Sequence, residues 1–100
     1  MSYKCISIDE VKALLDKGEV TLADVRDGRS FSEANITNAV NITQENVDAF
    51  LTNSNKEQPL IVYCYHGNSS KGAAEYFAAQ GFSDVSSMDG GFEAWRLKYK

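Results

Sequence analysis

The sequence has little of several residue types, and each scarcity excludes a class of protein. Two cysteines, Cys5 and Cys64, are too few for the disulfide framework of a small secreted domain. The single histidine, His66, has no cysteine or second histidine at metal-ligand spacing, so we expect no metal site and no bound cofactor. No apolar run approaches the roughly 20 residues of a membrane-spanning helix. The first ten residues also lack the basic-then-apolar pattern of an export signal.

Basic residues are scarce as well. Lys and Arg number 10 against 14 Asp and Glu, which gives a formal net charge of -4. The three arginines, at positions 26, 29 and 96, form no cluster. Nucleic acids and anionic membranes bind clustered cations. We therefore expect neither as a partner. The lack of a membrane-spanning run and of an export signal leads us to expect a soluble, cytoplasmic protein.

The chain has enough apolar residues for one core. Hydrophobic residues make up 43% of its 100 positions, and no segment has the composition of a disordered tail. A chain of this length forms one domain, which we expect to span residues 1–100.

Strand and helix patterns alternate along the sequence. A capping box at Ser7–Glu10 begins a helix that ends at Gly18. The patterns that follow predict strands at 20–25, 39–42, 60–63 and 84–88, and helices at 29–33, 45–51, 69–80 and 92–99. For the helix at 69–80, Ser69 or Ser70 is the expected cap and Gly81 the stop. This alternation predicts an α/β fold with a parallel sheet.

Cys64 follows the apolar run LIVY at 60–63, which is typical of a central strand buried on both faces. In parallel α/β sheets, binding sites gather beyond the carboxyl ends of the strands. Cys64 is therefore placed where a functional site is expected. Cys5 has no comparable setting, and we interpret it as structural.

The residues after Cys64 suit a reactive thiolate, the form in which cysteine acts as a nucleophile. The helix that begins near Ser69 directs free N–H groups at the loop. Gly67 and Asn68 tolerate unusual backbone angles and favour an anion-binding nest of amides. Ser70, Lys71 and His66 could add hydroxyls and positive charge. The alternative is that Cys64 is a small core residue at a strand end.

Two other cysteine chemistries do not fit this spacing. Cysteine-dependent phosphatases use Cys-x5-Arg, whose arginine grips the phosphate, but residue 70 is serine. They also place a histidine before the cysteine, where Tyr63 stands here. A Cys-x-x-Cys redox pair is excluded because residue 67 is glycine.

Four segments together resemble the rhodanese domain over essentially the whole chain. They are DVRD at 24–27, AVNI at 39–42, LIVYCYHGNSSKGAA at 60–74 and MDGGFEAW at 88–95. The third and fourth resemble most closely the small single-domain thiosulfate sulfurtransferases of the bacterial glycerol-3-phosphate regulon. The resemblance implies one α/β domain with a central parallel sheet of about five strands and helices on both faces.

The resemblance also implies a chemistry. Cys64 would attack the outer sulfur of thiosulfate and become a persulfide, and would then pass the sulfur to cyanide, a dithiol or another thiol in a ping-pong cycle. The loop Tyr65, His66, Gly67, Asn68 and Ser69 would hold the anions through backbone N–H groups. A six-residue loop, from 64 to 69, is associated within this superfamily with sulfur transfer, and a loop one residue longer with phosphate or arsenate.

Two alternatives to this enzyme stay open. One is a persulfide carrier that serves protein partners such as thioredoxin, with thiosulfate not the physiological donor. The other is a binding module without catalysis, although such modules usually lack the cysteine.

Other family positions have structural interpretations. Asp24, Arg26 and Asp27 are expected to form a salt-bridged cluster, with the alternative that Arg26 adds positive potential near Cys64. Gly90–Gly91 is expected to be a tight turn and Trp95 a core residue. The sequence departs from many relatives at 34–39, where Ala-Asn-Ile-Thr-Asn-Ala replaces a Gly-His-containing stretch. It also departs at Tyr65 and His66, where some relatives have two basic residues.

Overall fold

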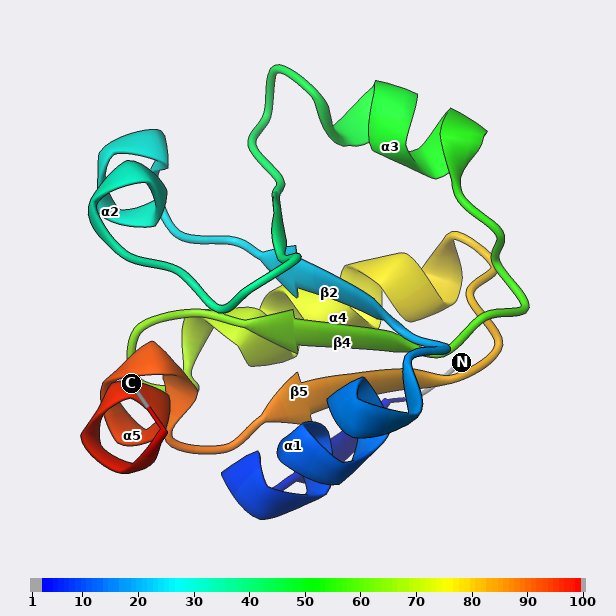
Figure 1. The fold of residues 1–100 in the computed structure, drawn as a ribbon. Coiled ribbons are helices and arrows are strands. Elements are labelled where there is room, and N and C mark those ends of the chain that lie inside the picture. Colours follow the sequence, from blue (N-terminus) through cyan, green and yellow to red (C-terminus); the bar gives the residue numbers. More distant parts are fainter. Residues whose placement is uncertain (1–2, 100) are drawn as a thin grey trace.

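The computed structural model describes residues 3–99 as a five-stranded parallel sheet flanked by helices (Figure 1). The strand order is β1-β5-β4-β2-β3. The strands are β1 Lys4–Ile6, β2 Thr21–Asp24, β3 Val40–Asn41, β4 Leu60–Tyr63 and β5 Val85–Met88. The helices are α1 Ile8–Lys17, α2 Gly28–Glu33, α3 Val47–Asn53, α4 Ser69–Ala79 and α5 Gly91–Lys98. The predicted α/β class with about five parallel strands is confirmed.

The helices cover both faces of the sheet, as predicted. Figure 1 shows α1 and α5 in front of the sheet and α4 behind it. The core is accordingly divided into two clusters. One lies on the side of α1 and α5 and includes Val11, Ile61, Tyr63 and Trp95. The other lies on the side of α3 and α4 and includes Phe77 with its neighbours.

The β4 strand lies in the middle of the sheet. It pairs with β2 on one side and β5 on the other, and all four of its residues are buried. Because its side chains alternate between the two faces, one strand contributes to both core clusters. The predicted central strand is confirmed, and it fixes the position of the residue that follows it.

The first helix begins and ends as its sequence predicts. The Ser7 hydroxyl accepts the Glu10 N–H, and the Glu10 carboxylate accepts the Ser7 N–H. Gly18 closes the helix in the left-handed region at φ 84°. These local signals were sufficient to predict both ends of the helix, because the capping residues are adjacent to the helix in the chain.

The predictions differ from the structure in several places. The helix predicted at 45–51 is α3 at Val47–Asn53. No strand was predicted at Lys4–Ile6, where the residues form the short edge strand β1 with only Ile6 buried. The predicted serine cap of α4 was wrong. The helix already begins at Ser69, its N-cap is Asn68, and no side chain caps it. The physical reason is that an amide of its first turn is directed at the sulfur of Cys64 instead.

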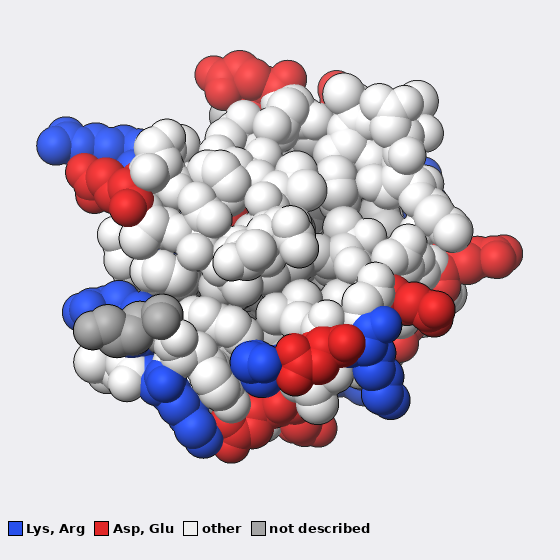
Figure 2. Space-filling model, in the orientation of Figure 1, with Lys and Arg blue, Asp and Glu red and all other residues white. Residues whose placement is uncertain are grey.

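Charged side chains lie around the rim of the face shown in Figure 2, with both signs interspersed along its lower edge. Ion pairs on the surface of α1 and α5 join Lys12 to Asp16, Arg96 to Glu93, and Lys98 to Asp9. No helix within residues 3–99 is long and apolar enough to cross a membrane. In the same residues, no three His, Cys, Asp or Glu side chains are grouped to hold a metal ion.

Candidate active site

Cys64 lies directly beyond the carboxyl end of β4 and is only 6% exposed. Its Sγ accepts hydrogen bonds from the N–H groups of Gly67 and Ser70, each at 3.2 Å. Ser70 is the second residue of α4, so its amide is one of those that a helix leaves unpaired at its N-terminus. The sulfur thus occupies the position that a capping oxygen usually takes.

The loop can curl around the sulfur because of Gly67. This residue has φ +94°, which L side chains rarely adopt, and a Cβ there would lie 3.0 Å from the Gly90 nitrogen. Asn68 was also predicted to adopt unusual backbone angles, but it lies in the ordinary right-handed region at φ -92°. A single left-handed residue therefore suffices to turn the loop.

The hydrogen bonds change the acidity of the thiol. Burial raises the pKa of Cys64, but the Ser70 hydroxyl and the N–H groups of Ser70, Gly67 and His66 outweigh it, and the pKa falls below its ordinary value. All of these groups stabilise the thiolate over the thiol. These hydrogen bonds therefore favour a charged sulfur at Cys64.

A buried hydroxyl pair lies beneath the loop. The Oγ atoms of Ser70 and Ser87 are 2.7 Å apart, and both residues are fully buried. Ser87 comes from β5, the neighbour of β4, and sequence reasoning did not single it out. Its strand pattern, with two consecutive serines in an otherwise apolar buried strand, was the available signal.

The helix α5 also contacts the loop. The Phe92 N–H donates to the Cys64 carbonyl oxygen at 2.7 Å, and the Glu93 N–H donates to the Tyr65 carbonyl oxygen at 3.0 Å. Gly90 and Gly91 precede these amides in left-handed conformations, at φ 79° and 66°, so the predicted turn is confirmed. Its contact with the Cys64 loop is a feature that the sequence did not reveal.

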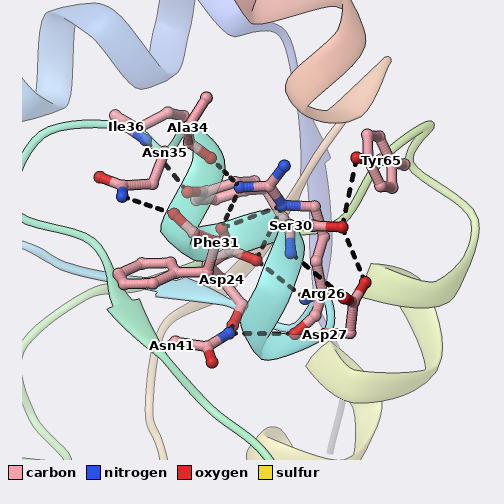
Figure 3. Close-up of polar contacts among 11 residues, drawn as sticks. Asp24, Arg26, Asp27, Ser30, Phe31, Ala34, Asn35, Ile36, Asn41 and Tyr65 are labelled. Carbon is pink, nitrogen blue, oxygen red and sulfur yellow. Dashed lines mark hydrogen bonds and ion pairs between the residues drawn. The ribbon is translucent and has the colours of Figure 1, made fainter.

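Arg26 lies beside the loop, but its charge is already paired (Figure 3). Its guanidinium binds both carboxylate oxygens of the buried Asp24, at 2.7 to 3.1 Å, and donates to the Ala34 carbonyl at 2.6 Å. It also stacks over the rings of Phe92 and Tyr65, at 4.3 and 5.1 Å from their centroids. The Asp24–Arg26 part of the expected cluster is confirmed. Asp27 instead caps α2, where its carboxylate accepts from the N–H and the hydroxyl of Ser30.

The remaining predicted residues lie at the rim. Tyr65, His66, Ser69 and Lys71 are exposed, and the Tyr65 hydroxyl donates to Ser30 in α2 at 3.2 Å. Their side chains therefore face the solvent side of the loop, whereas Cys64, Gly67 and Ser70 are buried.

The backbone of residues 34–39, the segment whose sequence differs from that of many relatives, is held by hydrogen bonds. The Ile36 N–H donates to the hydroxyl of the buried Tyr63 at 3.2 Å, and the Ala34 carbonyl accepts from Arg26. Burial raises the pKa of Tyr63, so this phenol stays neutral near neutral pH. The turn is thus held from the core although the residues of many relatives are missing.

A parallel α/β sheet with a cysteine-led amide loop at the end of its central strand is the arrangement of a rhodanese-like domain, and the chain belongs to that family. The match to the family covers residues 7–98.

Individual relatives narrow the comparison. Over 99% of this chain and 94% of its own length, a protein of Pseudoalteromonas translucida named thiosulfate sulfurtransferase GlpE is 46% identical. A protein of Tolumonas auensis with the same name is 47% identical over 94% of this chain and 89% of its own length. Among solved structures, a rhodanese-like domain protein from Staphylococcus aureus is 32% identical with a TM-score of 0.80, over 92% of this chain and 90% of its own.

The fold extends to more distant proteins. The human single-domain sulfurtransferase TSTD1 superposes with a TM-score of 0.87 over 99% of this chain and 100% of its own, at 20% identity. That likeness concerns the fold alone.

Proposed function

We propose that this protein is a thiosulfate sulfurtransferase in which Cys64 carries the sulfur. The observation that carries the proposal is the Cys64 sulfur with two backbone N–H groups at 3.2 Å and a lowered thiol pKa. The names of relatives that are 46% and 47% identical over nearly the full length support the same activity. The residues 1–100 act as one rhodanese domain.

The first half of the cycle loads the enzyme. The Cys64 thiolate attacks the outer sulfur of thiosulfate and forms a sulfur–sulfur bond. The original bond between the two thiosulfate sulfurs breaks, and its electron pair leaves with sulfite. The product is a Cys64 persulfide anion, so the negative charge moves one atom outward from Sγ. In this proposal the loop of Tyr65, His66, Gly67, Asn68 and Ser69, together with the Ser70 amide that already donates to Sγ, stabilises that charge in the transition state through backbone N–H groups.

The second half of the cycle unloads the enzyme. Cyanide attacks the outer sulfur of the persulfide, takes it away as thiocyanate and returns the Cys64 thiolate. A thiolate acceptor reacts in the same way and becomes a persulfide itself. Because each half releases a product before the next substrate binds, the kinetics are ping-pong.

Backbone recognition explains why this loop suits sulfur better than phosphate. Residue 70 contributes an N–H group and a hydroxyl, but no guanidinium to grip a tetrahedral oxyanion. Arg26, which the sequence suggested as a source of positive potential near Cys64, is bound to Asp24. The loop stabilises one concentrated negative charge, as on a thiolate or a persulfide.

An intact-mass measurement tests the proposal. After incubation with thiosulfate, the wild-type protein gains one sulfur atom and loses it on addition of cyanide. Cys64→Ser does not gain sulfur, whereas Cys5→Ser, which removes the exposed second thiol, gains it like the wild type. Uptake by Cys64→Ser at the wild-type level would show that the sulfur is carried elsewhere.

The sulfur acceptor is a separate question. The nucleophile is buried while Tyr65 beside it is 42% exposed, so a protein acceptor with a protruding thiol, such as thioredoxin, has an aromatic surface to contact. Both cysteines are free, which supports a reducing, cytoplasmic location. Turnover with cyanide, a small dithiol and reduced thioredoxin is compared. A much higher kcat/KM with thioredoxin makes the protein a persulfide carrier, and similar values make it a small-molecule enzyme.

A further inference from the structure

The first turn of α5 binds the backbone of the Cys64 loop rather than an anion. Its amides at Phe92 and Glu93 would otherwise be unpaired donors of the kind that attract negative charge. Here they donate to the carbonyl oxygens of Cys64 and Tyr65, at 2.7 and 3.0 Å. The loop is therefore held by α5 on one side and by α4 on the other.

Binding these carbonyls also fixes the direction of two amides. A peptide group is planar and trans, so its C=O and N–H point in opposite directions. The Cys64 carbonyl shares a peptide group with the Tyr65 N–H, and the Tyr65 carbonyl shares one with the His66 N–H. Holding the two carbonyls toward α5 turns both N–H groups away from it. The contribution of the His66 N–H to the lowered pKa of Cys64 agrees with this direction.

This approach of α5 to the loop depends on the absence of a side chain at Gly91. The residue is buried with φ +66°. A Cβ atom there would lie 2.3 Å from the Tyr65 carbonyl oxygen and 2.6 Å from the His66 nitrogen. Such distances are well inside van der Waals contact, and the obstacle is backbone, which has no rotamer to change. Any larger residue must push α5 and the loop apart.

We propose that Gly91 is a positioning residue for sulfur transfer. Having no side chain, it lets the first turn of α5 hold the Cys64 and Tyr65 carbonyls, and so aims the N–H groups of Tyr65 and His66 at the reacting sulfur. The reaction in which it acts is the one proposed above, whereas its effect on the Cys64 thiolate does not depend on any sulfur donor.

The first experiment compares Gly91→Ala with Gly18→Ala, both in a Cys5→Ser background so that Cys64 is the sole thiol. Gly18 also has a left-handed backbone, at φ +84°, but nothing lies within 4 Å of an added Cβ. It therefore reports backbone strain alone. We expect Gly91→Ala to raise the pH midpoint of Cys64 alkylation and to slow persulfide formation about tenfold or more, because hydrogen bonds to a charged group are weakened. Gly18→Ala shifts neither.

A second pair of variants removes a single N–H group and leaves Gly91 in place. Glu93→Pro lacks the amide that donates to the Tyr65 carbonyl, and proline is tolerated in the first turn of a helix. Glu93→Ala loses the same side chain, with its ion pair to Arg96, but keeps the amide. We expect a higher alkylation midpoint and slower persulfide formation in the proline variant than in the alanine variant. This pair decides the matter if Gly91→Ala does not fold.

The outcomes separate this inference from the proposed function. If folded Gly91→Ala and Glu93→Pro each match their controls in alkylation midpoint and in sulfur uptake, the positioning role is wrong although the enzyme still transfers sulfur. If wild-type Cys64 takes up no sulfur, the proposed function fails, and with it the role in transfer. The alkylation midpoints then still report whether Gly91 aims the amides at the thiolate.

Discussion

At the scale of single residues, the site concentrates its chemistry on Cys64 and Ser70. The backbone N–H of Ser70 donates to the Cys64 sulfur at 3.2 Å. The Ser70 hydroxyl forms a hydrogen bond with the Ser87 hydroxyl and also lowers the pKa of the Cys64 thiol. Ser87 is fully buried, and its hydroxyl forms a hydrogen bond with the Ser70 hydroxyl. A buried hydroxyl needs such a partner, so the two serines stabilise each other's orientation.

The lowered pKa of Cys64 predicts how the reactivity of the thiol depends on pH. The thiolate fraction falls as the pH drops through the pKa of the folded protein, which is lowered from the ordinary value of a cysteine thiol. In Cys5→Ser protein, we expect the rate of alkylation by iodoacetamide to have its midpoint below that value. Ser70→Ala should raise the midpoint by about half a unit to one unit, because a hydrogen bond of roughly 1 kcal/mol to the thiolate is lost.

A matched variant on β5 serves as the control. Ser86 is buried next to Ser87, but its side chain points to the opposite face of the sheet, so Ser86→Ala leaves the hydroxyl pair intact. Its alkylation midpoint should equal that of the parent protein. An unchanged midpoint in Ser70→Ala would mean that the backbone amides alone set the acidity of Cys64.

At the scale of elements, the end of β2 is tied to its surroundings by one buried ion pair. Asp24 is fully buried, and Arg26 binds it through two nitrogens while also reaching the Ala34 carbonyl. Asn41 in β3 donates to the Asp24 and Arg26 carbonyls, so the same short segment also binds the edge strand. Figure 3 shows these contacts converging beside α2 and Tyr65.

Removing Arg26 should destabilise the fold strongly. Arg26→Ala leaves the Asp24 carboxylate buried without its partner, a change that typically costs about 3–5 kcal/mol. The matched control is Arg29→Ala. Arg29 lies three residues after Arg26 and forms an exposed ion pair with Glu33. Urea unfolding measures both. A loss of stability as small in Arg26→Ala as in Arg29→Ala would show that the buried pair contributes no more than a surface pair.

Elements with local signals were the ones that the sequence predicted correctly. The capping box of α1, the buried run of β4 and the glycines at 18 and 81 act within a few residues of where they stand. The strand β1 was not predicted, because a segment of three residues with two exposed side chains has no periodic pattern of apolar residues. The cap of α4 was mispredicted because the partner of its amides is a sulfur six residues earlier, which capping rules do not consider.

The residues of the site likewise fall into those that a local sequence pattern predicts and those that it does not. Cys64 and the loop to Ser70 form one continuous segment, so their geometry follows from the strand–loop–helix pattern. Ser87, Gly91, Phe92 and Glu93 reach the loop only because β5 pairs with β4. Strand order is a property of the whole fold, and a single sequence without relatives' covariation does not specify it.

At the scale of the whole molecule, charge opposes the proposed substrate. The protein carries a formal net charge of -4, and thiosulfate is a dianion. The groups that bind the anion are amide dipoles, whose field falls off faster with distance than that of the net charge. The approach of thiosulfate is therefore governed by repulsion, and its binding by the loop.

Salt should therefore accelerate loading. We expect the second-order rate of persulfide formation from thiosulfate to rise about threefold between 10 and 150 mM sodium chloride, because the screening length shortens from roughly 30 to 8 Å. Stopped-flow single turnovers measure it, and alkylation by the uncharged iodoacetamide provides a salt-insensitive comparison. A rate that falls steadily with salt would show that local positive potential at the loop dominates the approach.

The use of main-chain amides around Cys64 has an evolutionary consequence. Amides are present whatever the side chain, so residues 65, 66, 68 and 69 can diverge among descendants without loss of the donors, with proline as the exception. The positions that resist divergence are those where the backbone conformation or a close approach excludes a Cβ atom, namely Gly67, Gly90 and Gly91. New donors and acceptors can therefore be selected through the rim, at Tyr65 and His66, while the sulfur chemistry beneath is inherited unchanged.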